Sequence, residues 1–230
     1  MKPLFEKEKE LDKTIVGIVT RNSARYIVNF LVLLDLKAQV DEVIVVDCGS
    51  TDDTIDLIEK CVAALSAKEK TFPVKIIQQD NADEGAAIRR LIAEAKKRDA
   101  DALVLVEATG EYDPADIPKI LEPIVKCDAD LVIGSRFTGD FRAENKTKLS
   151  FTERVWAKTS NFVANIGATT KVSDSQSGLR AISKYAMDMI SLKRANEAVK
   201  SEMVADAEKQ MIRIQEVGIG IWMKGSKQWF

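Results

Sequence analysis

Short, almost uninterrupted apolar runs alternate with amphipathic stretches of about a dozen residues between Thr14 and Gly134. Strands that are covered on both faces have this continuous apolar character, whereas half-exposed strands alternate apolar and polar residues. The alternation is typical of successive βαβ units and therefore of an open, mostly parallel sheet between helices. It predicts strands over residues 14–20, 42–47, 74–78, 102–107 and 130–134.

Helix start signals stand in the stretches between these runs. They lie at Asn22 or Ser23 before a helix over 24–36, at Ser50 before one over 51–65, and at Asp113 with Pro114. After Gly134 the alternation stops, and the polar stretch 135–150 predicts a mobile loop. Beyond it, the sequence predicts helices over 151–166, from Ser183 and over 197–210, and a late strand within 211–221.

Charge and composition exclude several classes of protein. The 34 Lys and Arg residues nearly balance the 36 Asp and Glu residues, so no overall field attracts nucleic acid or anionic lipid. The apolar stretch 26–34 is far shorter than the roughly 20 residues that span a bilayer. Residues 1–13 alternate in charge and lack the apolar centre of a signal peptide. We therefore expect a cytoplasmic protein without a transmembrane segment.

Cysteine and histidine usage limits the chemistry. Cys48, Cys61 and Cys127 lack the paired spacing of a disulfide framework or a zinc site, so we expect them to be buried or half-buried fillers. The chain contains no His, which removes the commonest general base. Any catalysis must use carboxylates, Lys, Arg, Tyr or a hard cation.

Polar residues follow several of the predicted strands. In an open parallel sheet, ligands bind beyond the carboxyl ends of the strands, where the loops to the next helices converge. The residues at this edge are Arg21, Asn22, Ser23, Asp47, Cys48, Gly49, Ser50, Glu107, Thr109, Glu111, Ser135 and Arg136. They are the candidate site residues.

Asp47 ends a predicted strand, Gly49 can adopt a positive φ, and Ser50 stands at a helix start. The Asp47 carboxylate suits two roles: accepting hydrogen bonds from a nucleobase or ribose, or satisfying the amides of its own loop. The sequence leaves both open.

Glu107 and Glu111 flank a glycine turn at the end of another predicted strand. Such hard oxygen ligands suit Mg²⁺ or Mn²⁺, which bridge to the pyrophosphate of a nucleotide. Solvated loop charges have the same spacing, so this segment alone does not identify a cation site.

Six segments occur in an order and at spacings that make chance similarity improbable. They are 47–54 (DCGSTDDT), 81–87 (NADEGAA), 133–137 (IGSRF), 174–181 (DSQSGLRA), 215–219 (QEVGI) and 225–227 (GSK). They resemble DDGSTDDT, N-x-GKGAA, IGSRF, D-x-x-SGFRA, EVPI and G-x-SK of the family 2 glycosyltransferases of the GT-A fold. Within that family, the similarity is to the branch of the dolichyl-phosphate sugar synthases.

The resemblance implies a three-layer, Rossmann-like nucleotide-diphospho-sugar transferase with a mostly parallel central sheet. It implies one domain over 1–230, with a nucleotide-sugar-binding half over 14–134 and an acceptor-side half over 135–230. The implied partners are a nucleoside diphosphate sugar, Mg²⁺ or Mn²⁺, and a phosphate-bearing acceptor, commonly a polyprenyl phosphate. Inversion at the anomeric carbon and peripheral membrane contact are further expectations, while the oligomeric state is not specified.

The resemblance also assigns roles to residues. The catalytic candidates are Glu107, Asp174 and Arg180, and the metal-ligand candidates are Glu107, Thr109 and Glu111. The substrate-binding candidates are Asn22, Asp47, Gly49, Arg136, Gln176, Lys224 and Lys227. Asp174 and Gln176 suit either positioning of the acceptor or ordering of their loop.

Three departures from the family pattern fall at chemically important positions. Asn22-Ser23 replaces N-E, Asp47-Cys48 replaces D-D, and Glu107-Ala108-Thr109 replaces the D-x-D metal motif. Glu111 stands where relatives often carry Gln, which leads to the hypothesis that Glu107 and Glu111 still hold a divalent ion. The alternative hypothesis is a nucleotide-binding or regulatory partner protein that retained the fold and lost turnover.

Overall fold

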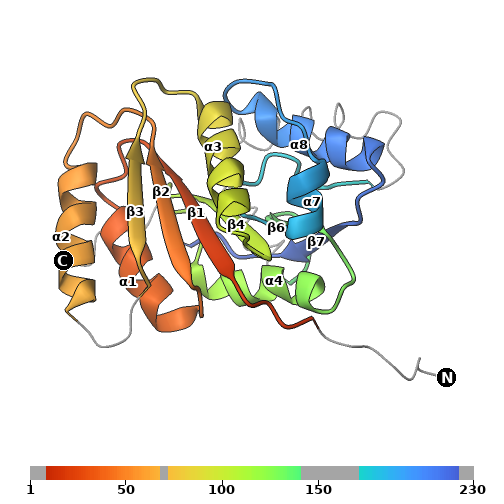
Figure 1. The fold of residues 1–230 in the computed structure, drawn as a ribbon, viewed down its shortest axis with the longest axis horizontal. Coiled ribbons are helices and arrows are strands. Elements are labelled where there is room, and N and C mark those ends of the chain that lie inside the picture. The colour runs from red at the N-terminus through yellow and green to blue at the C-terminus, as the bar shows by residue number, and fades with distance from the viewer. Residues whose placement is uncertain (1–8, 68–71, 141–170, 223–230) are drawn as a thin grey trace.

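A seven-stranded sheet runs through the described part of the chain in the order β3-β2-β1-β4-β6-β5-β7 (Figure 1). The computed structural model describes residues 9–67, 72–140 and 171–222. Each pair of neighbouring strands is parallel except for the two pairs that include β6. The expected open, mostly parallel sheet is thus confirmed.

The predicted strands agree closely with the observed ones. They are β1 (Thr14–Thr20), β2 (Glu42–Asp47), β3 (Val74–Gln78), β4 (Ala102–Glu107), β5 (Leu131–Ser135) and β7 (Ile214–Gly218). All seven residues of β1 are buried, as expected for a strand with helices on both faces. Strand β5 begins one residue later than predicted, and β7 is shorter than the segment 211–221 that contains it.

Strand β6 (Arg180–Ser183) was not predicted. It lies antiparallel between β4 and β5, with Leu105 opposite Arg180 and Val132 opposite Ala181. Its four residues are too short for a periodic signal and begin with an arginine, a residue rarely buried. The strand carries the preceding loop, 173–179, to the carboxyl ends of β4 and β5.

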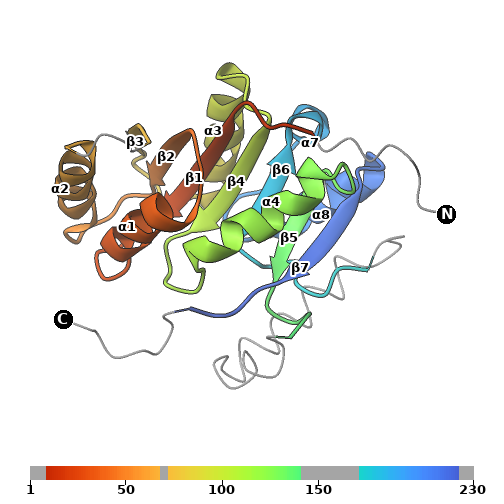
Figure 2. The same cartoon turned by 90° about the horizontal axis from the view of Figure 1, so that it is seen from below.

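Helices cover both faces of the sheet (Figures 1 and 2). One face packs against α1 (Ile27–Lys37), α2 (Thr54–Ser66) and α4 (Ile117–Val125), which follows the short 3₁₀ turn η1 (Pro114–Asp116). The other face packs against α3 (Glu84–Lys97), α7 (Lys184–Met189) and α8 (Ala198–Lys209). The two apolar cores and the sheet between them form the expected three layers.

Two of the predicted helix starts are confirmed by their caps. The Asp113 side chain accepts a hydrogen bond from the Ala115 amide at 2.9 Å, and Ser183 caps α7 through the Ala186 amide at 3.2 Å. The predicted cap at Ser50 is wrong. Helix α2 begins at Thr54, because the Ser50 hydroxyl donates to the Asp47 carboxylate instead.

Cys48 and Cys61 are buried, as expected, but Cys127 is exposed in the turn after α4, so it does not fill the core.

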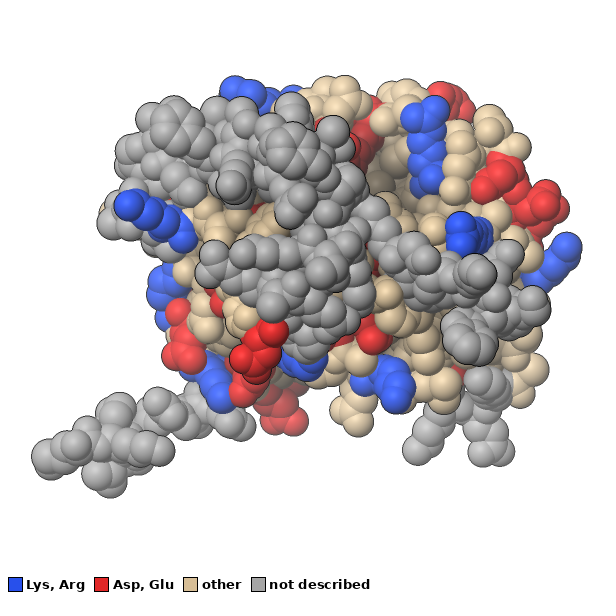
Figure 3. Space-filling model, turned by 180° about the vertical axis from the view of Figure 1, so that it is seen from behind, with Lys and Arg blue, Asp and Glu red and all other residues tan. Residues whose placement is uncertain are grey.

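Part of the predicted loop 135–150, the predicted helix 151–166, Lys224 and Lys227 lie outside the described residues. Within the described ranges, no helix combines the length and the apolar character needed to cross a membrane. On the face in Figure 3, basic and acidic side chains are interspersed.

A buried glutamate and its basic partners connect α3 to the sheet. Glu94 of α3 is 6% exposed and contacts Lys75 of β3 at 2.8 Å and Arg98 at 2.5 Å. Arg98 also contacts Glu42 of β2 at 2.7 Å. Hydrogen bonds from Lys75 and Arg98 outweigh the effect of burial and lower the pKa of Glu94 to about 2.

Arg180 of β6 holds the loop before it. Its guanidinium is buried and donates to the backbone carbonyls of Ser175, Ser177 and Lys200 at 2.6, 3.0 and 2.8 Å. One side chain thus ties loop 173–179 to the first turn of α8. Buried backbone carbonyls need hydrogen-bond donors, and the Arg180 guanidinium is the donor for these three.

Replacing Glu94 with Gln is expected to reduce the free energy of unfolding at pH 7 by about 1 kcal/mol, since Lys75 remains partly exposed to solvent. The pKa of Glu94 is lower in the folded state than in the unfolded state. Its contribution is therefore complete above about pH 4.5 and is lost as the pH falls toward about 2. Urea unfolding of wild type and Glu94→Gln between pH 7 and pH 3 measures this, with exposed Glu59→Gln as control. A stability difference that does not shrink below pH 4.5 would contradict the assignment.

Replacing Arg180 with Lys is expected to lower the free energy of unfolding by about 3 kcal/mol, because an ammonium cannot bond all three carbonyls from this position. Thermal unfolding measures the loss, and Arg90→Lys on the exposed side of α3 is the control. Unchanged stability in Arg180→Lys would show that the guanidinium does not hold this loop.

Candidate functional site

A cavity of about 590 Å³ opens at the carboxyl ends of β1, β2 and β4. Its walls come from the loops that follow these strands and from the first turns of α3 and α8. The lining residues include Arg21, Ser23, Cys48, Glu84, Glu107, Thr109 and Ala198. Another, larger hollow of about 1160 Å³ lies at the opposite edge of the sheet, around Thr14, Asp41 and Val125. Because open parallel sheets bind ligands at their carboxyl edge, the smaller cavity is the candidate site.

Two carboxylates of the cavity wall share contacts with one buried ammonium group. Glu107 ends β4, Glu84 begins α3, and Lys200 stands in the first turn of α8. The Lys200 Nζ atom lies 2.5 Å from Glu107 Oε1 and 3.2 Å from Glu84 Oε1. Lys200 is only 6% exposed, so solvent screens these contacts weakly.

The environment shifts the pKa values of all three groups. Burial and the charge of Glu107 raise the pKa of Glu84 to about 7, against the opposing effect of Lys200. Burial would also raise the pKa of Glu107, but the Lys200 charge outweighs it and lowers that pKa. Burial opposes the charge of Lys200, yet Glu107 and Glu84 keep its pKa above the usual value. Glu107 and Lys200 therefore form the ionised pair, and Glu84 is the group that carries the proton at lower pH.

Gly178 leaves the space that Glu107 occupies. A Cβ atom at this position would lie 2.5 Å from Glu107 Cδ. The Gly178 amide donates to the Tyr112 hydroxyl at 2.7 Å, which fixes the loop against the segment after β4. The glycine of the 174–181 segment is thus explained by close approach to Glu107 rather than by a positive φ.

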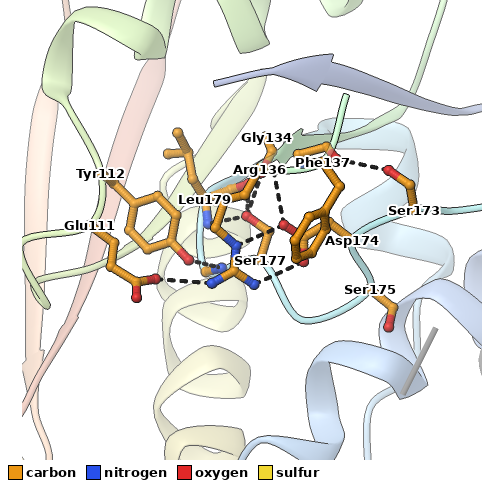
Figure 4. Close-up of polar contacts among 12 residues, drawn as sticks. Glu111, Tyr112, Gly134, Arg136, Phe137, Ser173, Asp174, Ser175, Ser177 and Leu179 are labelled. Carbon is orange, nitrogen blue, oxygen red and sulfur yellow. Dashed lines mark hydrogen bonds and ion pairs between the residues drawn. The ribbon is translucent and has the colours of Figure 1, made fainter. Parts of the chain in front are cut away.

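A second group of charges surrounds Arg136, directly after β5 (Figure 4). Its Nε and Nη2 donate to the two carboxylate oxygens of Asp174 at 2.8 and 2.9 Å, and Nη1 donates to Glu111 Oε2 at 3.0 Å. Burial alone would lower the pKa of Arg136, but Tyr112, Asp174 and Glu111 raise it. The guanidinium is therefore a permanent cation between the two carboxylates.

Glu216 of β7 holds Asp174 in place. Asp174 is fully buried, and its amide donates to Glu216 Oε1 of β7 at 2.9 Å. The Ser173 amide donates to Glu216 Oε2 at 2.9 Å. Glu216 thus fixes the loop that presents Asp174 to Arg136. This accounts for the glutamate in the 215–219 segment.

The loops after β1 and β2 bind each other. The Asp47 carboxylate accepts hydrogen bonds from the Ser50 amide, at 2.9 Å, and from the Ser50 hydroxyl. Asn22 Oδ1 accepts the Thr51 amide at 2.8 Å, and the Asn22 amide donates to Ser50 Oγ at 2.9 Å. Gly49 has the positive φ that was expected, +74°. Asp47 is 3% exposed, so in this structure its carboxylate satisfies its own loop.

The expected metal ligands do not fit a cation in this arrangement. Glu107 contacts Lys200, Glu111 contacts Arg136, and Thr109 offers a single exposed hydroxyl. Within 9–67, 72–140 and 171–222, no group of three or more His, Cys, Asp or Glu side chains is arranged to hold a metal ion. Both carboxylates proposed as ligands already have a protein cation.

The remaining predicted residues have structural partners. Arg180, expected at the acceptor, has its guanidinium buried among three carbonyls, so it positions loop 173–179 rather than facing the cavity. Gln176 Nε2 donates to Ser201 Oγ of α8 at 2.5 Å, which ties the same loop to that helix.

Sequence reasoning missed Glu84 and Lys200 as site residues. One signal was present: Glu84 stands where the resembling segment N-x-GKGAA carries lysine. A charge reversal beside Glu107 requires a cation from elsewhere in the chain, and Lys200 is that cation. Nothing in the local sequence of α8 distinguishes Lys200 from a solvated lysine.

Several known proteins are similar in sequence to this chain. A UDP-N-acetylglucosamine–dolichyl-phosphate N-acetylglucosaminyltransferase from Methanococcus voltae is 29% identical over 188 residues, covering 78% of this chain and 74% of that protein. A dolichol-phosphate mannosyltransferase from Pyrococcus furiosus is 25% identical, covering 81% of this chain and 50% of that protein.

Among solved structures, glucosyl-3-phosphoglycerate synthase from Mycobacterium tuberculosis in complex with Mn²⁺, UDP-glucose and phosphoglyceric acid is similar to this chain with a TM-score of 0.68. The similarity covers 94% of this chain and 73% of that one at 16% identity, which establishes a shared GT-A fold. The family model described as glycosyl transferase family 2 matches residues 15–189. Since this match spans well over half of the sequence, the chain belongs to glycosyl transferase family 2.

Proposed function

We propose that this protein transfers a hexose from a nucleoside diphosphate sugar to a phosphate-bearing acceptor, with inversion at the anomeric carbon. The observation that carries the proposal is the cavity at the carboxyl ends of β1, β2 and β4. In a family 2 chain, this is the edge of the sheet where a nucleotide binds.

The donor diphosphate would meet Arg21 in this cavity, whose described lining also holds three carboxylates, Glu84, Glu107 and Glu197. Arg21 lines it, is exposed, and has no carboxylate partner among the described residues. Helices α3 and α8 also present their first turns to the cavity, and helix amino termini attract phosphate groups. These features support a donor whose diphosphate faces Arg21.

A phosphate acceptor explains how transfer proceeds in a chain without histidine. A phosphate oxygen is ionised at neutral pH, so its attack on the anomeric carbon needs no general base. We assign the acceptor to the side of Arg136, whose planar guanidinium suits phosphate and is oriented by Asp174.

The relatives support a polyprenyl phosphate, since two of them are named for transfer to dolichyl phosphate. Such an acceptor would bring the protein to a membrane surface as a peripheral partner. Assays with dolichyl phosphate and with 3-phosphoglycerate separate a lipid acceptor from a soluble one.

Replacing Thr109 with Trp is expected to abolish nucleotide binding while leaving the fold intact, because this exposed residue lines the cavity and the indole would fill it. Wild type in the presence of a nucleoside diphosphate at about 100 times its Kd should gain about 2.7 kcal/mol of stability. Thermal unfolding with ADP, CDP, GDP, UDP and dTDP measures this. Glu59→Trp on the outer side of α2 is the control. Equal stabilisation of Thr109→Trp and wild type would place the nucleotide elsewhere.

Replacing Arg136 with Lys is expected to lower kcat/KM for the acceptor by about tenfold to a hundredfold, because lysine keeps the charge but cannot form the planar fork. Nucleotide affinity should remain unchanged, since Arg136 does not line the donor cavity. Initial rates of sugar transfer and the anomeric configuration of the product are the measurements. An equal fall in nucleotide affinity would contradict this division, and absence of transfer by wild type to both acceptors would favour the binding-protein alternative.

A further inference from the structure

A protein cation stands where the family pattern leads one to expect a metal ion. We propose that the ammonium group of Lys200 replaces a divalent cation at Glu107, so that nucleoside diphosphates bind to this protein without a metal. The inference rests on the proposed nucleotide donor and concerns what balances the charge beside it.

The contacts of Lys200 are those of a cation held between ligands. Its Nζ atom lies against one oxygen of Glu107 and one of Glu84, at 2.5 and 3.2 Å. Neither of these two buried oxygens has a hydrogen-bond partner with standard geometry among the described residues. The ammonium therefore supplies the charge that neutralises the buried Glu107 and also contacts the buried oxygen of Glu84.

Lys200 cannot readily withdraw to admit a metal ion. Its own carbonyl accepts a hydrogen bond from Arg180 Nη1 at 2.8 Å, which fixes the first turn of α8 to loop 173–179. The side chain is 8% exposed, so a displaced ammonium would remain buried without a partner. Removing one member of a buried ion pair is strongly unfavourable.

The second expected metal ligand, Glu111, is also paired with a cation of the protein. Glu111 contacts Arg136, and Arg136 is held in place by Asp174, which Glu216 holds in turn. Thr109 then remains as one neutral oxygen on an exposed turn. Mg²⁺ and Mn²⁺ are held through carboxylates and dehydrate reluctantly, so a single hydroxyl does not replace these ligands.

Nucleotide binding with and without metal tests the inference on the wild-type protein. Isothermal titration with ADP, CDP, GDP, UDP and dTDP is carried out in EDTA and in Mn²⁺. For each nucleotide that binds, the affinities in the two conditions are expected to agree within about twofold. Binding that requires Mn²⁺ would overturn the inference and leave the proposed function standing. Absence of binding by all five nucleotides in both conditions would overturn the proposed function and this inference with it.

Replacing Lys200 with Met provides a readout independent of the nucleotide. The change frees Glu107 and Glu84 together, so Lys200→Met is expected to bind Mn²⁺ at least about tenfold more tightly than wild type. The electron paramagnetic resonance signal of free Mn²⁺ measures this without nucleotide. Lys184→Met is the control, because it removes a lysine from another ion pair, with Asp99, at the opposite edge of the sheet.

Circular dichroism establishes that the variants are folded. If Lys200→Met unfolds, Lys200→Arg, which keeps the charge, is expected to bind nucleotide in EDTA and to remain without Mn²⁺ affinity. Wild type that binds Mn²⁺ as tightly as Lys200→Met, or Lys200→Arg that requires Mn²⁺ for nucleotide binding, would show that Lys200 does not stand in for the metal.

Discussion

Two carboxylates at the carboxyl edge of the sheet are each held by a cation of the protein. Glu107 obtains Lys200 from α8, and Glu111 obtains Arg136 from the segment after β5. Desolvating an unpaired carboxylate costs several kcal/mol, so both contacts constrain where the elements that carry the cations can lie. The position of the first turn of α8 over β4 follows from this pairing as much as from the apolar contacts of Val199 and Met203.

Strand β6 makes the pairing possible. Because it runs antiparallel between β4 and β5, loop 173–179 arrives at the carboxyl ends of both strands. There Gly178, without a side chain, leaves room for Glu107. Asp174 orients Arg136 by accepting its hydrogen bonds. Arg180 donates a hydrogen bond to the carbonyl of Lys200. One short strand therefore connects the side proposed for the donor to the side proposed for the acceptor. The 174–181 segment acts as a structural junction between two charge clusters.

The sequence predicts the strands well and the site only in part, for physical reasons. Continuous apolar runs such as VIVV in β2 specify a strand covered on both faces without knowledge of the neighbouring strands. By contrast, β6 depends on pairing with two strands distant in sequence, which no local pattern records. Ser50 is a residue type that often caps helices, yet its hydroxyl donates to the Asp47 carboxylate instead of capping α2. The meeting of Glu84 and Lys200 depends on how α3 and α8 pack, so it becomes visible only in the fold.

The charge balance at the cavity reconciles the family fold with the altered motif. A nucleoside diphosphate is repelled by bare carboxylates, so a site with Glu107 and Glu84 in its wall must neutralise them before a donor can bind. Solved structures of this fold hold Mn²⁺ together with UDP-glucose. We infer that in this chain the ammonium group of Lys200, fixed to α8, neutralises Glu107, and that Arg21 faces the phosphates of the donor. Because Glu107 balances the charge of Lys200, Arg21 is the cation of the described lining that is left for the phosphates. On this inference, the change from D-x-D to Glu107-Ala108-Thr109 replaces a metal-binding motif with a carboxylate that a cation of the protein already pairs.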